Sequence, residues 1–296
     1  MKKLLAIMVV TTLLGSTLFA KSTEGTKELK MYACGITRVA FVKELNKAFT
    51  KKFDIKIPLN KKGGVPFVLK GLSDKKVEIG SGCREPFKND TEKNLWSTQV
   101  AWGALGFIVN PKNKVDNIST ENIKKVLTGK ITNWKELGGE DKPINLIIRE
   151  GKGSGVGSTA REMLFGDKNY EFSKKAKILK TSGPIRKAVI ADPYAFAIDD
   201  VTSSQRIKGI KLLKVDGINP TKKNILNKKY KLRRPFFLYL DRKPEHLAKE
   251  YIDFALSDEG QAVISKTGTA NLDEATGAGD EENLIFQNLK FNIKTK

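Results

Sequence analysis

Short apolar runs alternate with longer amphipathic stretches along most of the chain. In residues 28–33 every second position is apolar, which is the period of a strand with one buried face. The run at 104–110 is almost wholly apolar, as in a strand that is buried on both faces. The pattern predicts strands at 28–33, 54–59, 76–80, 104–110, 144–149 and 233–240, and a further strand at the end of 187–200.

The stretches between these strands have helical periodicity. In residues 41–53 the apolar side chains that share one helical face are Phe41, Leu45, Ala48 and Phe49. A helix at 119–129 is predicted to begin at Ser119 or Thr120 and to end at Gly129. Further helices are expected at 68–72 and within 244–268. This alternation predicts an α/β fold with a mainly parallel sheet flanked by helices, and a ligand at the carboxyl ends of the strands.

The N-terminus has the layout of a secretory signal peptide. Lys2 and Lys3 precede an apolar run from Leu4 to Leu14, and small residues allow cleavage after Ala20. The apolar run is too short for a retained membrane anchor. We therefore expect residues 1–20 to be removed, and the mature protein to be soluble, exported to the periplasm and not embedded in a membrane.

The chain has a formal net charge of +21 over 296 residues. Such a charge is typical of nucleic-acid-binding proteins, but here the lysines are scattered instead of forming a compact run with aromatic residues between them. We interpret the charge as a lysine-rich solvated surface that also steers anions toward a cleft, and we expect no nucleic-acid partner.

Two cysteines, Cys34 and Cys83, and a single histidine, His246, limit the chemistry of the chain. They are too few for a zinc site, and without further histidines neither Ser-His nor Cys-His nucleophilic catalysis is available. We therefore expect no catalytic residues, no metal and no cofactor. In an exported protein, two cysteines usually form one disulfide.

Three loops after predicted strands share one design. They are "YACGITRVAF" at 32–41, "IGSGCREPF" at 79–87 and "REGKGSGVGSTAREML" at 149–164. Glycines let backbone N–H groups approach a ligand closely, and a helix start carries unpaired N–H groups and partial positive charge. The candidate contacts in the first two loops are Gly35, Ile36, Thr37, Ser81, Cys83 and Arg84, with Thr37 also expected as the N-terminal cap of its helix.

The third loop adds a cation to this design. The planar fork of Arg149 matches two oxygens of a tetrahedral anion, and Ser154 can donate a hydroxyl. The loop is neither a P-loop nor a dinucleotide fingerprint, because the required lysine and third glycine are missing. The alternative is a flexible connection in which Thr159 and Glu162 form an ordinary capping box.

Four stretches of the chain resemble the periplasmic phosphate-binding proteins of phosphate ABC transporters, which are type II solute-binding proteins. They are "GKITNWKELGG" within 119–139, "REGKGSG" at 149–155, residues 214–240 and "SDEGQAVISKTG" at 257–268. The resemblance extends over roughly residues 27–272 and implies two lobes joined by a two-stranded hinge. Lobe one would hold 27–105 and 235–296, and lobe two 106–234.

The resemblance also implies a ligand set. Thr37 matches a threonine of the family, and Arg149 matches its arginine. Ser154 and Gly155 match its Ser-Gly helix start, so the adjoining Gly153 belongs to the same loop.

At four positions the chain departs from the family. Val156 replaces a hydroxyl residue, Lys62 stands about where the family has a serine, and Lys152 stands where it often has a second acid. Cys83 or Arg84 stands where it has an aspartate that accepts the proton of phosphate. Without that aspartate, selectivity for a protonated anion would depend on a nearby acid such as Glu150.

The resemblance implies a function in transport. The lobes would close on an inorganic oxyanion, with phosphate favoured, and the closed monomer would deliver it to an ABC permease. Other anions of sulfate-like, phosphonate, metalloid or carboxylate type stay open, as do a ligand sensor and an exported phosphoester-cleaving enzyme. In this fold Cys34 and Cys83 follow neighbouring strands, which implies a disulfide between their loops; the alternative is a pair of thiols that contact a metalloid oxyanion.

Overall fold

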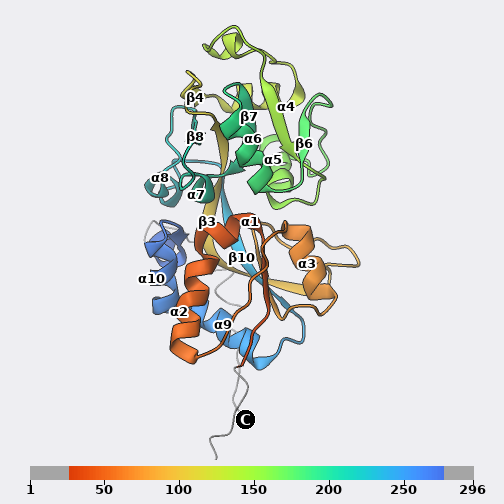
Figure 1. Cartoon of the computed structure of the whole chain (residues 1–296), viewed down its shortest axis with the longest axis vertical. Coiled ribbons are helices and arrows are strands. Elements are labelled where there is room, and N and C mark those ends of the chain that lie inside the picture. The colour runs from red at the N-terminus through yellow and green to blue at the C-terminus, as the bar shows by residue number, and fades with distance from the viewer. Residues whose placement is uncertain (1–26, 277–296) are drawn as a thin grey trace, which may run out of the picture.

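One long strand organises the chain. β3 (Leu95–Val109) pairs antiparallel along its first part with β10 (Arg233–Asp241) and along its last part with β7 (Ala195–Asp200). The computed structural model describes residues 27–276, and in it β3 and β10 run from one lobe of the molecule into the other (Figure 1). The expected signal peptide at 1–20 and the stretch after residue 276 lie outside the described residues.

The main sheet has the order β1-β2-β10-β3-β7-β5-β6, with β8 and β11 also paired to β3. The remaining strands of this sheet are β1 (Met31–Ala33), β2 (Ile79–Gly82), β5 (Asn145–Arg149), β6 (Lys177–Leu179), β8 (Lys211–Leu212) and β11 (Ala270–Asn271). A small second sheet joins β4 (Asn117–Ile118) and β9 (Lys214–Val215). The main sheet is parallel at β1-β2 and at β7-β5-β6 but antiparallel around β3 and β10. The expectation of a mainly parallel sheet is therefore wrong for its middle, because the two crossing strands run in opposite directions.

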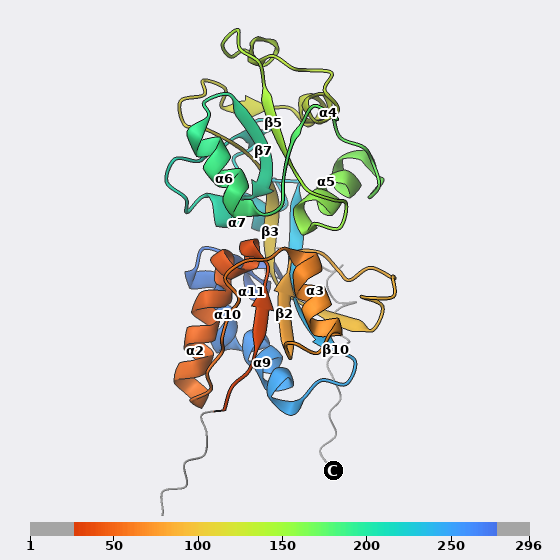
Figure 2. The same ribbon diagram turned by 45° about the vertical axis from the view of Figure 1, so that its right-hand side comes forward.

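Helices cover both faces of the strands in each lobe (Figure 2). The longer ones are α2 (Lys43–Phe53), α3 (Val65–Ser73), α4 (Thr120–Thr128), α5 (Gly155–Phe165), α6 (Ser182–Ala191), α9 (His246–Leu256) and α10 (Asp258–Lys266). The shorter ones are α1 (Gly35–Thr37), which continues into α2 through π-helical Arg38–Val42, then a 3-10 turn at Trp134–Leu137, α7 (Val201–Ser204), α8 (Lys222–Leu226) and α11 (Leu272–Thr276). Within the described part of the chain, no helix has the length and apolar content needed to cross a bilayer.

Local sequence signals account for many of these elements. Ser119 caps α4 by accepting a hydrogen bond from the Asn122 N–H, and Gly129 ends the helix in a left-handed conformation, as predicted. On α2, Phe49 is fully buried and packs its ring against Tyr251 of α9 at 5.1 Å. The periodicity of the apolar residues therefore predicts this interface correctly.

Three predicted boundaries differ from the structure. The strand expected at 54–59 is reduced to single bridges at Lys56 and Leu59; Pro58 between them has no N–H to donate to a ladder. The expected strand at 76–80 begins only at Ile79, and the one at 104–110 extends back to Leu95. Its early part carries polar side chains on a half-exposed face, which hides it from an apolar pattern.

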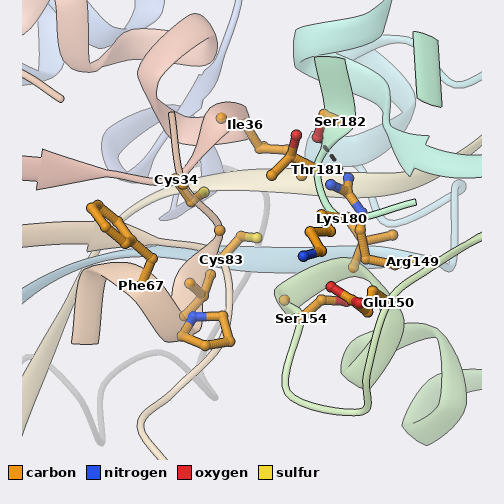
Figure 3. Close-up of a pocket in the computed structure, with 17 residues that line it drawn as sticks. Cys34, Ile36, Phe67, Cys83, Arg149, Glu150, Ser154, Lys180, Thr181 and Ser182 are labelled. Carbon is orange, nitrogen blue, oxygen red and sulfur yellow. Dashed lines mark hydrogen bonds between the residues drawn. The ribbon is translucent and has the colours of Figure 1, made fainter. Parts of the chain in front are cut away.

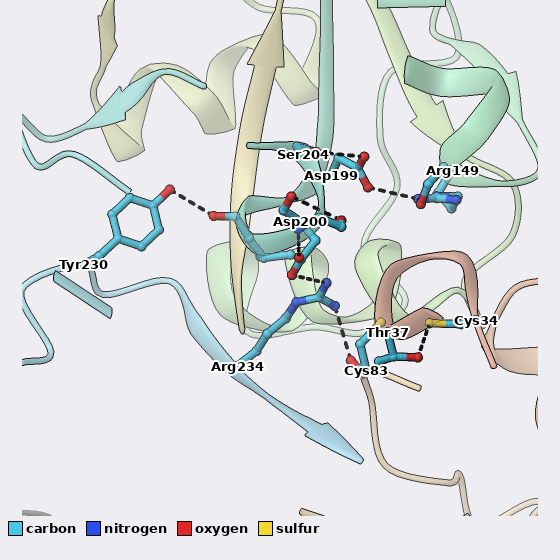
Figure 4. A network of polar contacts seen from close by, with 12 residues as sticks. Cys34, Thr37, Cys83, Arg149, Asp199, Asp200, Ser204, Tyr230 and Arg234 are labelled. Atoms are coloured by element: carbon cyan, nitrogen blue, oxygen red, sulfur yellow. Dashed lines mark hydrogen bonds and ion pairs between the residues drawn. The ribbon is translucent and has the colours of Figure 1, made fainter. Parts of the chain in front are cut away.

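A buried network of charges lies where β7 meets the crossing strands (Figure 4). Asp200 accepts a hydrogen bond from Arg234 of β10 at 3.0 Å, and Arg234 also donates to the backbone carbonyl of Cys83 at 3.2 Å. The side chains of Arg234 and Asp200 are 2% and 0% exposed. Burial raises the pKa of Asp200, and the positive charge of Arg234 opposes this shift. Arg234 therefore neutralises a carboxylate that is fully removed from water.

We expect the substitution Arg234→Met to lower the free energy of unfolding by about 3–5 kcal/mol, because it leaves a buried charge without its partner. Urea denaturation followed by circular dichroism measures the change. Lys47, in an exposed ion pair with Glu44, is the control, and Lys47→Met should change the free energy of unfolding by about 0.5 kcal/mol. An equally small change at both positions would contradict the role assigned to Arg234.

Candidate functional site

A pocket of about 290 Å³ lies where the two lobes meet (Figure 3). It collects residues that follow β1, β2, β5 and β6, together with the start of α3. Its lining consists of Cys34, Gly35, Ile36, Gly63, Gly64, Val65, Pro66, Phe67, Cys83, Arg149, Glu150, Ser154, Gly155, Val156, Lys180, Thr181 and Ser182. The carboxyl ends of parallel strands therefore do meet at one site, as the strand-and-helix alternation predicts.

Four helices begin at this pocket. Their N-cap residues all line it: Cys34 of α1, Gly64 of α3, Ser154 of α5 and Thr181 of α6. The first turns read GIT, VPF, GVG and SGP, so they contain no carboxylate that would neutralise the helix ends. Because each helix start carries partial positive charge and unpaired N–H groups, the arrangement favours an anion.

Arg149 adds a full positive charge to the pocket. Its side chain is 7% exposed and donates to the Ser182 hydroxyl at 2.6 Å and to Asp199 at 3.4 Å. Burial lowers the pKa of Arg149, and the Asp199 carboxylate opposes this shift. Its Nε has no hydrogen-bond partner among residues 27–276. A buried donor of this kind is costly unless something accepts from it, so Arg149 has spare capacity to bind an anion.

The two cysteines lie side by side at the pocket as free thiols, so the expected disulfide is not formed in the described chain. The hydrogen-bonding interaction with the neighbouring Cys83 thiol is the largest cause that lowers the pKa of Cys34 to about 6. Burial opposes that shift, while hydrogen bonds from Thr37 and from the backbone at Thr37 and Ile36 favour it. The same thiol–thiol hydrogen bond, together with burial, raises the pKa of Cys83. The two cysteines therefore titrate as a coupled pair, in which Cys34 is the more acidic thiol.

Seven of the residues predicted from the sequence line the pocket. They are Gly35, Ile36, Cys83, Arg149, Ser154, Gly155 and Val156. Ser154 caps α5 by accepting from the Gly157 N–H at 2.9 Å, and its own hydroxyl hydrogen stays available for a ligand. Glu150, which the sequence suggests as a nearby acid, also lines the pocket.

Five predicted contact residues lie outside the pocket lining: Thr37, Lys62, Ser81, Arg84 and Gly153. Ser81 is buried in β2 and donates to a backbone carbonyl of β10 at 3.0 Å, and Lys62 is exposed on the turn before α3. Thr37 is not the cap of its helix, because the helix starts three residues earlier and Cys34 holds the cap position. The Thr37 hydroxyl lies 3.4 Å from the Cys34 sulfur, behind the pocket.

Arg84 has a structural role in place of the predicted ligand contact. Its guanidinium makes two hydrogen bonds to Glu92, at 2.7 and 2.8 Å, and stacks on Phe87. Its Nε donates to the Gly153 carbonyl at 2.9 Å, which ties the loop after β2 to the loop before α5. The arginine is therefore neutralised and fully engaged.

Two parts of the lining are absent from the sequence-based prediction. They are the segment 63–67 at the start of α3 and the segment 180–182 at the start of α6. Both carry a recognisable signal: a small residue or hydroxyl residue stands two or three positions before Pro66 or Pro184. Proline in the first turn is typical of a helix start, and this spacing could have indicated both helix ends.

Comparisons with known proteins agree with this geometry. A family model described as a PBP superfamily domain matches residues 41–259. The phosphate-binding protein PstS of Borreliella burgdorferi is 30% identical over 208 residues, which cover 68% of this chain and 74% of that protein. The PstS protein of Bacillus subtilis is 30% identical over 214 residues, which cover 68% and 66%.

Solved structures extend the similarity to the fold. A putative phosphate ABC transporter substrate-binding protein from Clostridium perfringens, solved with bound phosphate, is 30% identical with a TM-score of 0.75. The match covers 83% of this chain and all of that one. An ABC-type phosphate transport receptor from Vibrio cholerae, at 21% identity, shares the fold with a TM-score of 0.63. The architecture is that of the type II periplasmic binding proteins.

We expect the free energy of unfolding to rise between about pH 6 and pH 9, because the folded Cys34 releases its proton in this range while the unfolded thiol keeps it. The contribution of Cys34 ionisation to the free energy of unfolding is fully present near pH 9 and is lost as the pH falls through about 6. Cys34→Ser should remove this part of the rise. Urea denaturation in the presence of reductant, at several pH values for both proteins, measures it; equal slopes would contradict a thiolate at Cys34.

Proposed function

The chain belongs to the PBP superfamily, among its PstS phosphate-binding proteins, and from this premise we propose that it captures inorganic phosphate between its lobes and delivers it to an ABC permease. It acts as an exported, periplasmic binding protein and not as an enzyme. The pocket supports this proposal, because it has donors for an anion but no arrangement for covalent catalysis of the Ser-His or Cys-His type. The single histidine, His246, starts α9, away from the pocket lining.

One observation carries the proposal: four helix N-termini and Arg149 surround the same small pocket. Each helix end contributes only about 0.3–1 kcal/mol in an exposed setting, so tight binding requires several of them around a site that excludes water. The uncompensated donor of Arg149 supplies the charge-assisted hydrogen bond. A tetrahedral oxyanion with several acceptor oxygens can use all of these donors at once.

The acidic side chain of Glu150 favours phosphate over sulfate. It is a carboxylate in the lining, and it can accept a hydrogen bond from the proton that phosphate carries near neutral pH. Sulfate has no such proton, so its negative charge and that of the carboxylate would repel each other without a hydrogen bond to offset the repulsion. Glu150 thereby fills the role that the sequence leaves open at positions 83 and 84.

We also propose that residues 27–105 with 235–276 form lobe one, and 106–234 lobe two; the expected continuation of lobe one to residue 296 lies outside the described residues. Two features support this division: β3 and β10 are the strands that cross between the lobes, and contacts from both sides meet at the pocket. At Gly155 of α5, a Cβ atom would lie only 2.4 Å from the Cys83 sulfur and 3.1 Å from Val65. The lobes therefore approach each other closely at this glycine.

We expect Arg149→Ala to weaken phosphate binding about 10- to 100-fold, because a hydrogen bond to a charged group contributes about 1.5–3 kcal/mol. Isothermal titration of the phosphate-stripped protein measures the dissociation constant, with sulfate, arsenate, molybdate and a phosphonate as competitors. Arg242→Ala is the matched control, since this exposed arginine bonds only at the far end of β10. Tighter binding of another anion would reassign the ligand, and no binding of any anion would overturn the proposal.

We expect Gly155→Ala to reduce phosphate affinity, since the added methyl group meets Cys83 and Val65 and holds the lobes apart. Gly183→Ala in α6 is the control, because a Cβ there meets nothing within 4 Å. The double variant Gly155→Ala with Cys83→Ala should regain part of the affinity by making room. Unchanged affinity in Gly155→Ala would show that the lobes do not need this contact to hold the ligand.

A further inference from the structure

The donors that hold a phosphate ion in the proposed function are helix ends and Arg149, and the thiol pair at the pocket is not one of them. Cys34 and Cys83 directly follow β1 and β2, which pair in parallel with Ala33 opposite Ser81. This register places the two side chains next to each other at one end of the strand pair, and their interaction is the largest cause of the pKa shift of each. Each cysteine is 3% exposed, and both line the cavity. Two free thiols that follow paired strands and line one cavity form a ligand set of their own.

The surroundings of the thiols limit which ligand they can take. Thiolates bind soft metals, but zinc sites use three or four protein ligands. Between residues 27 and 276, no group of three or more His, Cys, Asp or Glu side chains is arranged to hold a metal ion. Arg149 and Lys180 in the same lining also repel a cation. The geometry therefore favours a ligand that is uncharged, bonds to two sulfurs and keeps an oxygen of its own.

We propose that Cys34 and Cys83 form a covalent binding site for trivalent arsenic, taken up as neutral arsenous acid, As(OH)₃. Each sulfur replaces one hydroxyl group on arsenic. Two As–S bonds form and two As–O bonds break. The hydroxyl displaced by the Cys34 thiolate leaves as hydroxide and takes a proton from solvent water, and the hydroxyl displaced by Cys83 leaves with the thiol proton of Cys83 as water. Arsenic stays in the trivalent state, so no oxidant or reductant is consumed. The third hydroxyl remains on arsenic, where the donors of the pocket can reach it.

The two cysteines have different parts in this reaction. The thiolate is the nucleophilic form of cysteine, and Cys34 supplies it because its hydrogen bonds hold its pKa at about 6. Cys83 keeps its proton, since burial and the neighbouring thiolate raise its pKa. It therefore has a proton ready for the second departing hydroxyl. Such a division is what a stepwise double substitution needs.

The adduct would occupy the pocket in which an anion binds. Arsenite should therefore block phosphate binding, and excess phosphate should slow the reaction with arsenite. This consequence rests on the proposed function, whereas the covalent capture does not.

The test uses the full mature chain, kept reduced by a phosphine because dithiol reductants compete for arsenic, and titrated with sodium arsenite. We expect the number of reactive thiols in the unfolded, quenched protein to fall from two to zero with one arsenic bound. In Cys34→Ser and Cys83→Ser the apparent affinity for arsenite should fall at least about 100-fold. When both sulfurs are present, the second As–S bond forms within the protein, at a high effective concentration of the second thiol.

Controls separate this site from the phosphate site. Arg149→Ala should lose phosphate binding but keep the arsenite reaction, and both serine variants should keep their fold, measured by thermal unfolding. Equal reaction of the single-serine variants, or zinc binding to the thiol pair in preference to arsenite, would overturn the proposal. A pair that stays disulfide-bonded under the phosphine would overturn it as well.

Discussion

Two consecutive carboxylates at the end of β7, Asp199 and Asp200, connect the pocket with the strands β3 and β10 that run between the lobes. Successive side chains of a strand point to opposite faces, so Asp199 and Asp200 serve different partners. Asp200 pairs with Arg234 of β10, and through that arginine it contacts the loop after β2. Asp199 accepts from Arg186 at 2.5 Å and from Arg149 at 3.4 Å. Both carboxylates are fully buried, and buried charges are tolerated only with such partners. The carboxylate that positions the pocket arginine is therefore the direct neighbour in the chain of the carboxylate that pairs with β10.

This arrangement leaves the pocket positively charged. Asp199 is shared by two arginines, and its shorter contact is to Arg186, so Arg149 is only partly neutralised. The N-termini of the four helices at the pocket have no acidic residue in their first turns, so their partial positive charges add to the positive potential of the pocket. Arg84, by contrast, has a carboxylate of its own in Glu92 and lies outside the lining. Arg149 therefore differs from Arg84 in two respects: it shares its buried carboxylate with a second arginine, and its Nε has no hydrogen-bond partner among residues 27–276.

The sequence predicts the elements and the general place of the site better than it predicts the contacts. Glycine-rich loops after strands and the arginine at 149 are local features, and they lead to the pocket. The pairing of Arg84 with Glu92 depends on how the irregular segment between β2 and β3 turns back on itself over eight residues. The antiparallel middle of the sheet depends on how segments far apart in the sequence meet. The local pattern of apolar and polar residues specifies neither. Thr37 has the right side chain for a cap, but the helix begins where β1 ends, at Cys34. The prediction of a disulfide follows from the number of cysteines and the expected compartment, which say nothing of how the two thiols shift each other's pKa.

The sulfur of Cys34 and a bound anion make opposite demands on the same helix end. The thiolate already takes hydrogen bonds from the backbone at Ile36 and Thr37, and these are the groups that a helix start offers to an anion. An anion in the pocket also repels the thiolate, which favours its protonation. Protonation of Cys34 and anion binding must then be linked. Protonation of Cys34 raises the affinity for the anion, and a bound anion raises the proton affinity of Cys34 by the same factor. The thiol pair thus makes anion affinity depend on the charge of the protein's own pocket, in addition to the ionisation of the ligand.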